Sequence, residues 1–103
     1  MKCFLHISRD EQRKRLEDRI RDPKKQWKLG PSDLEDRRHW DDFQRAYEDA
    51  LTNCNTEHAP WHIVPADRKW YRNLVVARLV LQTLERLDPQ FPPFDPTLIT
   101  KID

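Results

Sequence analysis

Glycine is nearly absent from this chain of 103 residues, because Gly30 is its only one. A phosphate-binding loop of the form G-x-x-x-x-G-K needs two glycines, which let the backbone wrap closely around phosphate oxygens. The sequence therefore contains no such loop. It also shows no Ser-His-Asp or Cys-His arrangement of the kind that supports nucleophilic catalysis. We place no catalytic residue in this chain.

Cysteine and long apolar runs are also scarce. Cys3 and Cys54 are the only cysteines and form no C-x-x-C pair, which is typical of reduced thiols in a cytosolic protein. No apolar run is long enough to cross a bilayer, and the apolar core of residues 1–7 is too short for a signal peptide. We expect a cytoplasmic protein that does not associate with membranes.

The net charge is small, at +1, so the chain has no overall field that would attract nucleic acid. The sum conceals a local split. Residues 9–28 hold nine Lys or Arg against five Asp or Glu, whereas residues 33–50 hold seven acidic residues against three Arg. The positive charge is therefore concentrated in one short part of the chain.

The chain is organised around residues 56–67. The bulky run Trp61 to Val64, between Pro60 and Pro65, predicts a short buried strand over residues 60–65. Residues 67–88 follow with the most apolar helical pattern of the sequence. Because apolar residues cover most of its circumference, we expect this helix to be buried on nearly all sides.

A second apolar run, at residues 3–7, predicts another buried strand close to the N-terminus. Ser8 follows as a helix N-cap, and Glu11 three residues later completes a capping box. The helix that begins here has only Leu16 and Ile20 as large apolar residues. We therefore expect most of it to face water.

A basic connector at residues 24–29 separates this helix from the next one. Gly30 suits the N-cap of the second helix, Pro31 suits its first position, and Asp33 places a carboxylate against the helix dipole. We predict a single second helix after them. Its apolar residues form one continuous stripe: Trp40, Phe43, Tyr47, Ala50 and Leu51.

The order of strand, two polar helices, strand and apolar helix predicts an α/β fold in which a helical excursion projects between two short parallel strands. We treat residues 1–103 as a single partial domain whose sheet is continued by strands outside this sequence. Either the chain is a C-terminal fragment, or a partner supplies the missing layer. Residues 89–103 form a tail, proline-rich at its start, that we expect to lie along a surface or to stay loose.

A basic cluster is the first candidate site. Arg15 and Arg19 lie one helical turn apart, and Lys25 and Lys28 follow beyond the turn. Guanidinium groups bind phosphate oxygens in pairs and ammonium groups act as mobile point charges, so the cluster suits a polyanion or a triphosphate. The alternative is ordinary solvent-exposed ion pairing, such as Glu11 with Arg15. The sequence leaves both interpretations open.

The loop after the strand at residues 60–65 is the second candidate site. In α/β sheets, ligands bind at the carboxyl ends of the strands. Lys69 and Arg72 lie in the first turns of the helix that this loop opens. The alternative is that Asp67 serves only as the N-cap of that helix.

Two further patterns do not predict a metal site. Asp41 and Asp42 are neighbours on a helix and point about 100° apart, so they are poorly placed to chelate Mg²⁺ together. His58 and His62 have the spacing of a zinc pair on a helix, but Pro60 between them excludes the helix. We therefore place no metal ligand in this chain.

With these residues in view, the chain resembles the C-terminal part of the type-2 polyphosphate kinase family, whose members are polyphosphate:nucleotide phosphotransferases. The resemblance covers residues 4 to about 88. The matching residues are Phe4 to Ser8, Glu11, Gln12, Arg15, Pro23, Lys25, Trp27, Lys28, Asp33, Trp40 to Asp42, Ala46 to Glu48, Thr56, Ala59 to Trp61, Pro65 to Asp67, Lys69 and Arg72. Two positions depart from the family pattern: Gly30 stands where Ser or Thr is usual, and Phe43 stands where Tyr is usual.

The resemblance implies a P-loop-kinase-like three-layer α/β/α sandwich in which residues 8–53 form a helical lid over polyphosphate and nucleotide phosphates. The residues that it implies for phosphate or polyphosphate binding are Arg15, Arg19, Lys25 and Lys28. Those that it implies border the nucleotide are Pro65, Asp67, Lys69 and Arg72. It also implies Mg²⁺ as the cofactor, with ligands that lie, like the family's phosphate-binding loop, upstream of this sequence.

The function that follows from the resemblance is transfer of a phosphoryl group between inorganic polyphosphate and a nucleoside mono- or diphosphate, with this chain inactive on its own. The alternative is a non-catalytic helical interaction module that folds against a partner protein. Nucleic-acid binding through the lysines around Trp27 is disfavoured by the acidic second helix. The sequence leaves a homo-oligomer open.

Overall fold

Two short parallel strands form the centre of the computed structural model, which describes residues 1–102. β1 (Lys2–His6) pairs with β2 (Trp61–Pro65) in the register that places Leu5 beside Val64. One backbone bond continues the ladder at each end, from the Lys2 N–H to the Pro60 carbonyl and from the Ala66 N–H to the His6 carbonyl. The prediction of an α/β fold with two short parallel strands is confirmed.

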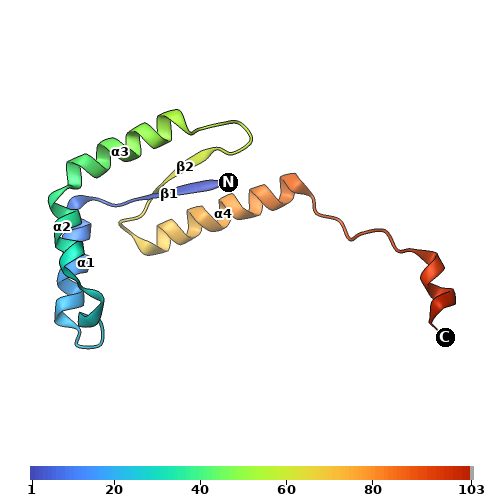
Figure 1. Cartoon of the computed structure of the whole chain (residues 1–103), viewed down its shortest axis with the longest axis horizontal. Coiled ribbons are helices and arrows are strands. Elements are labelled where there is room, and N and C mark those ends of the chain that lie inside the picture. Colours follow the sequence, from blue (N-terminus) through green and yellow to red (C-terminus); the bar gives the residue numbers. More distant parts are fainter. Residues whose placement is uncertain (103) are drawn as a thin grey trace.

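Two helices flank these strands. In both ribbon views, α3 (Trp40–Asn53) and α4 (Lys69–Leu87) lie on opposite sides of β1 and β2 (Figure 1). α3 reaches the sheet through the Tyr47 ring, whose centroid lies 4.8 Å from that of Phe4 in β1. The layers are therefore helix, sheet and helix, as an α/β/α sandwich requires.

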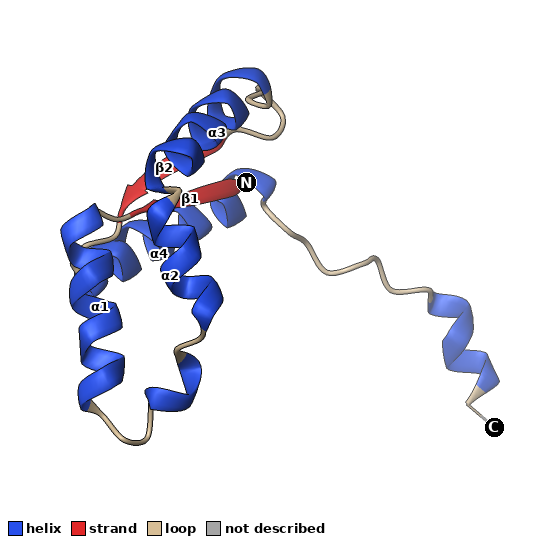
Figure 2. Ribbon diagram, turned by 60° about the vertical axis from the view of Figure 1, so that its left-hand side comes forward, coloured by secondary structure: helices blue, strands red, loops and turns tan. Residues whose placement is uncertain are grey.

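A helical hairpin projects from the end of β1, as Figure 2 shows. It consists of α1 (Arg9–Arg21), the short 3₁₀ helix η1 (Gln26–Lys28) and α2 (Pro31–Arg38). Arg37 of α2 donates hydrogen bonds to the Arg9 carbonyl and to the Gln12 side chain of α1, at 2.8 and 3.1 Å. We call residues 9–38 the α1–α2 hairpin.

The single second helix that the sequence predicted is in fact two helices. α2 ends at Arg38 and α3 begins at Trp40, with His39 between them at φ −92° and ψ 24°. The apolar stripe belongs to α3 alone, because α2 carries only Leu34 as a large apolar residue. α2 bonds to α1, whereas α3 covers the sheet. Because these two contacts require different helix directions, the helix is interrupted at His39.

Capping chemistry follows the prediction at two helices and departs from it at the third. Ser8 Oγ accepts a hydrogen bond from the Glu11 N–H, and Asp33 accepts one from the Gly30 N–H, so both predicted N-caps are confirmed. The reciprocal half of the first capping box is absent, because Glu11 binds Arg15 instead. Asp67 does not cap α4, whose N-cap position is Arg68, and the interpretation of Asp67 as an N-cap is wrong.

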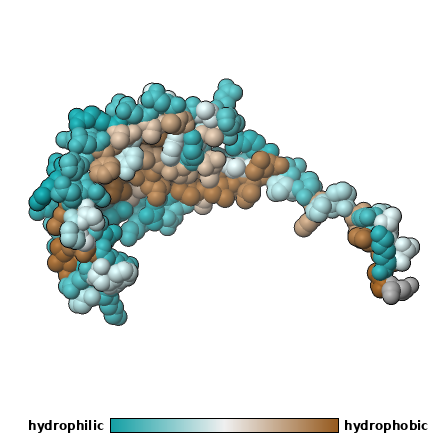
Figure 3. Space-filling model, viewed as in Figure 1, coloured by the Kyte–Doolittle hydropathy of each residue, from teal (hydrophilic) through white to brown (hydrophobic). Residues whose placement is uncertain are grey.

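The expectation that the third helix is buried on nearly all sides is also wrong. No residue of α4 is buried; Trp70 is 64% and Leu81 is 55% exposed. Within residues 1–102, Val64 and Ala66 are the only buried hydrophobic residues. The reason is that α4 meets β2 along one side, and within residues 1–102 no further layer packs against the other side. Figure 3 shows a band of apolar residues on the surface along this helix.

The C-terminal tail leads away from the rest of the chain (Figure 1). Residues 88–95 contain no helix or strand, as the prolines predicted. The 3₁₀ helix η2 (Pro96–Lys101) follows and was not predicted. It begins where the Asp95 carboxylate accepts a hydrogen bond from the Thr97 N–H. Among the residues that the structure describes, no helix has the length and apolar character needed to cross a membrane.

We predict that protonation of His39 stabilises the junction between α2 and α3. The pKa of His39 is raised, first because its ring bonds to Asp42 at 3.1 Å and then because it bonds to Glu35 at 3.2 Å. A raised pKa in the folded chain means that the stabilisation is complete below the ordinary histidine pKa and is lost as the pH rises through the raised value.

NMR titration of the His39 ring measures this pKa directly. The Asp42→Asn variant should return it toward the ordinary value, because a neutral amide replaces the strongest acceptor. An identical pKa in the two proteins would show that the pairing in the structure does not persist in solution.

Candidate functional site

Basic side chains from three elements converge on one hollow, with a volume of about 360 Å³. Six of the seven residues that line it are cationic, and Asp18 is the single carboxylate. The lining residues are Arg15, Asp18, Arg19, Lys25, Lys28, Lys69 and Arg72. We call this hollow the basic groove.

Parallel pairing of the strands explains why the groove forms. α1 follows the carboxyl end of β1, and α4 follows the carboxyl end of β2, so both helices begin at the same edge of the sheet. This edge is where α/β folds place their ligands. Arg15 and Arg19 lie one turn apart on α1, and Lys69 and Arg72 occupy the first turn of α4. The basic residues of α1 and those of α4, which are far apart in the sequence, thus form one surface.

The four residues that the sequence analysis assigned to phosphate all line the groove, together with Lys69 and Arg72. Pro65 and Asp67 do not line it. The binding of phosphate by the first four residues, and of nucleotide by the second set, stays a prediction.

Three of these cations are held loosely. Arg19 lies 3.7 Å from Asp33 and Lys25 lies 3.9 Å from Asp22, at the long end of ion-pair distances. Lys28 lies over the Trp27 ring, 5.6 Å from its centroid. Surface pairs of this kind contribute little to stability, so their cations are able to exchange the present partner for a bound anion.

Arg15 is held differently. Its Nε donates to Glu11 at 3.0 Å, and one terminal nitrogen donates to the backbone carbonyls of Ala66 at 2.7 Å and Asp67 at 3.3 Å. Its side chain is only 24% exposed. The ion pair of Glu11 with Arg15, which was the alternative interpretation of the basic cluster, therefore exists, and it coexists with the groove.

Asp67 joins the two sides of the groove at their base. Its Oδ1 accepts a hydrogen bond of 2.7 Å from the backbone N–H of Ser8, which lies 59 residues earlier in the chain. The pKa of Asp67 is lowered below its usual value. The main cause is the bond from the Ser8 N–H to the charged carboxylate, and the second cause is a bond from the Ser8 hydroxyl. This contact links residues 66–68, which we call the β2–α4 loop, to the start of α1.

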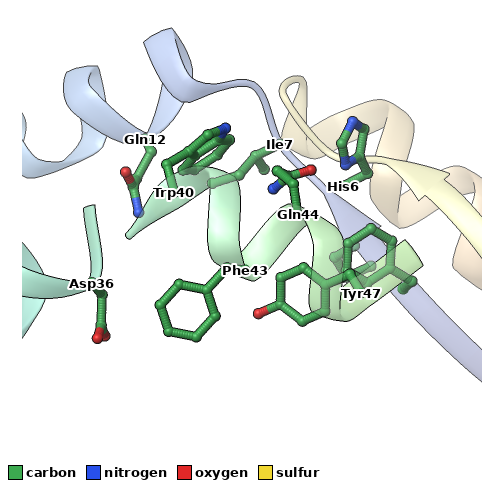
Figure 4. A pocket seen from close by; sticks show the side chains of 10 residues that line it. His6, Ile7, Gln12, Asp36, Trp40, Phe43, Gln44 and Tyr47 are labelled. Atoms are coloured by element: carbon green, nitrogen blue, oxygen red, sulfur yellow. The ribbon is translucent and has the colours of Figure 1, made fainter. Parts of the chain in front are cut away.

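A second hollow, of about 270 Å³, lies between the end of β1 and the helices α1, α2 and α3. Trp40, Phe43 and Tyr47 supply aromatic rings from α3, and Figure 4 shows Phe43 and Tyr47 side by side. Gln12 and Asp36 add polar groups from the α1–α2 hairpin. In the sequence these aromatic residues were visible only as part of one apolar stripe, and the hollow was not predicted, because periodicity does not show where a packed surface ends.

The acidic and histidine patterns do not gather into a metal site in residues 1–102, where no group of three or more His, Cys, Asp or Glu side chains is placed to hold an ion. Asp42 is engaged instead by His39 and Arg45. The described residues therefore bring together no set of three protein ligands for Mg²⁺.

We predict that acid weakens the contact between Ser8 and Asp67. A lowered pKa means that this stabilisation is present above the ordinary aspartate pKa and is lost as the pH falls through the lowered value. The Ser8 amide proton, followed by NMR through an acid titration, should report the loss. In Asp67→Asn the side-chain carbonyl still accepts the bond, so the shift should no longer titrate. A Ser8 signal that titrates equally in both proteins would contradict the contact.

Comparison with known proteins places these features in a family. Residues 1–92 match the family described as Polyphosphate kinase 2 (PPK2). The AMP/ADP-polyphosphate phosphotransferase of Meiothermus ruber is 52% identical over 92 residues, which are 89% of this chain and 34% of that protein. The ADP-polyphosphate phosphotransferase of Rhodopseudomonas palustris is 45% identical over 96 residues, which are 93% of this chain and 33% of that protein.

A solved structure agrees. The crystal structure of Polyphosphate Kinase 2 from Arthrobacter aurescens TC1 is 44% identical, with a TM-score of 0.86 over 98% of this chain and 37% of that one. This chain thus spans about a third of the length of these three relatives. The match of residues 1–92 shows that the chain belongs to the polyphosphate kinase 2 family.

Proposed function

We propose that this chain supplies the phosphate-binding surface of an enzyme that transfers a phosphoryl group between inorganic polyphosphate and a nucleoside mono- or diphosphate. The observation that carries the proposal is the basic groove, where cations from α1, from the connector around η1 and from α4 surround one hollow with a single carboxylate. Membership of the family and the names of its relatives support the same reaction.

The physical logic of phosphoryl transfer fits such a surface. Charge spreads over the phosphate oxygens in the transition state, so catalysis depends mostly on positioning and on electrostatic stabilisation. Arg19, Lys25 and Lys28 hold the phosphates of the polyphosphate chain. Lys69 and Arg72 face them from the first turn of α4, where the helix dipole also favours an anion, and hold phosphates of the nucleotide.

In this scheme the chain binds and orients and performs no bond-making step by itself. Mg²⁺, which the family resemblance implies, would neutralise phosphate charge when bound.

A second candidate function is a non-catalytic interaction module that folds against a partner protein. The exposed apolar residues of α4, such as Trp70 and Leu81, favour it, because a surface of this kind usually marks a contact with another protein. This alternative requires no response to polyphosphate, so the same experiment separates the two functions.

We predict that long-chain polyphosphate stabilises the folded chain. At about a hundredfold excess over its Kd, a ligand that binds only the folded state adds about 2.7 kcal/mol to the free energy of unfolding. Thermal denaturation followed by circular dichroism should show a rise in Tm, which shrinks between low and moderate salt because the binding is ionic. Arg19→Ala combined with Lys28→Ala should remove most of the rise.

The control is Lys14→Ala combined with Arg78→Ala, which removes the same charge from exposed positions outside the groove. It should keep the full response. The proposal fails if the control variant loses the response as completely as the groove variant, or if polyphosphate leaves the Tm of a folded wild-type chain unchanged.

A further inference from the structure

α1 has few means of holding its direction relative to the sheet. Its large apolar residues are Leu16 and Ile20, and Ile20 is exposed. No residue of the helix is buried. Hydrophobic packing of the kind that normally fixes the angle of a helix is therefore weak here. Polar contacts at the base of the helix have to supply the constraint.

Two such contacts join α1 and its N-cap to the β2–α4 loop. The Ser8 N–H donates to the Asp67 carboxylate at 2.7 Å, which fixes the point where the helix begins. Arg15, almost two turns later, donates to the carbonyls of Ala66 and Asp67. Since Ala66 is one of the two buried hydrophobic residues of residues 1–102, Arg15 is anchored to the best-packed part of the chain.

The guanidinium of Arg15 also binds its own helix. Nε donates to Glu11 one turn earlier, so the planar group bridges α1 and the loop rigidly. A lysine ammonium has three donors, but they rotate about one nitrogen at the end of a flexible stem and do not form a rigid planar fork. Arg15 therefore has close hydrogen-bond partners within the protein, whereas the partners of Arg19, Lys25 and Lys28 are distant.

We propose that Arg15 is a positioning residue: it fixes the angle between α1 and the β2–α4 loop and thereby the width of the basic groove, and it does not itself bind phosphate. This role replaces the phosphate-binding role that the family resemblance implies for Arg15. The positioning role rests on the proposed function in one respect, which is that the basic groove binds phosphate.

The lever arm of the helix makes the angle important. The 13 residues of α1 span about 20 Å at 1.5 Å per residue. A tilt of about 10° at the base displaces the far end by about 3 Å, which is the length of a hydrogen bond. Arg19 and the connector with Lys25 and Lys28 lie toward that far end, so their distance from Lys69 and Arg72 depends on Arg15.

The helix angle is tested by pulsed electron–electron distance measurements between spin labels on Lys14→Cys in α1 and Arg78→Cys in α4. Cys3 and Cys54 are replaced by serine in every sample, and circular dichroism checks that the helices persist. Arg15→Gln and Arg15→Lys should both broaden or shift the distance distribution. Arg19→Gln, which removes the same charge one turn later, should leave it unchanged.

The salt dependence of polyphosphate binding by the same variants, without labels, tests the second half of the proposal. Each phosphate contact that is lost lowers the slope of log Kd against log salt concentration by about one. Arg15→Gln should weaken binding and leave the slope at the wild-type value, and Arg15→Lys should not restore the affinity. Arg19→Gln should lower the slope.

The proposal is overturned if Arg15→Gln keeps the wild-type distance distribution, or if it lowers the slope by about one while Arg15→Lys restores binding. Failure of the proposed function looks different. A wild-type chain that does not bind polyphosphate removes the phosphate site, yet the distance measurements still decide whether Arg15 sets the angle of α1.

Discussion

The parallel pairing of β1 with β2 is the constraint on which the rest of the structure depends. Lys2 stands beside Trp61 and His6 beside Pro65, although more than fifty residues separate the two strands in the chain. Because parallel strands end at the same edge of a sheet, the helices that follow them start side by side. Arg19 and Lys69, which the sequence places far apart, consequently line the same groove. An antiparallel pair would have sent α4 to the opposite end of the sheet.

Local chemistry made much of the fold predictable from the sequence. Proline on both sides of Trp61 to Val64 marked a strand, and Ser8 and Gly30 marked helix starts that the structure confirms. The break at His39 was not predictable in the same way. Residues on both sides of it are helical, and only the different contacts of α2 and α3 set the change of direction. Helix continuity is therefore a tertiary property here.

The candidate site shows the same division. The basic residues were visible in the sequence, but their convergence was not, because it requires the register of the strands. The capping box of Ser8 illustrates the reason at the level of one bond. Sequence spacing offered the Glu11 carboxylate as acceptor for the Ser8 N–H, while the fold supplied Asp67 from a distant loop and left Glu11 for Arg15. Likewise, the apolar pattern of α4 described its composition but not which neighbours would cover it.

The split at His39 has a mechanical consequence. The α1–α2 hairpin leaves the body of the protein at Ser8 and returns to it at His39, while α3 stays against β1 through Tyr47. A rigid segment that is joined to the body of the protein at two points moves most easily by rotation about the line through those points. The hydrogen bonds that cross from Ser8 and Arg15 to Ala66 and Asp67 act near the first of these points, where a small displacement corresponds to a large swing of the free end.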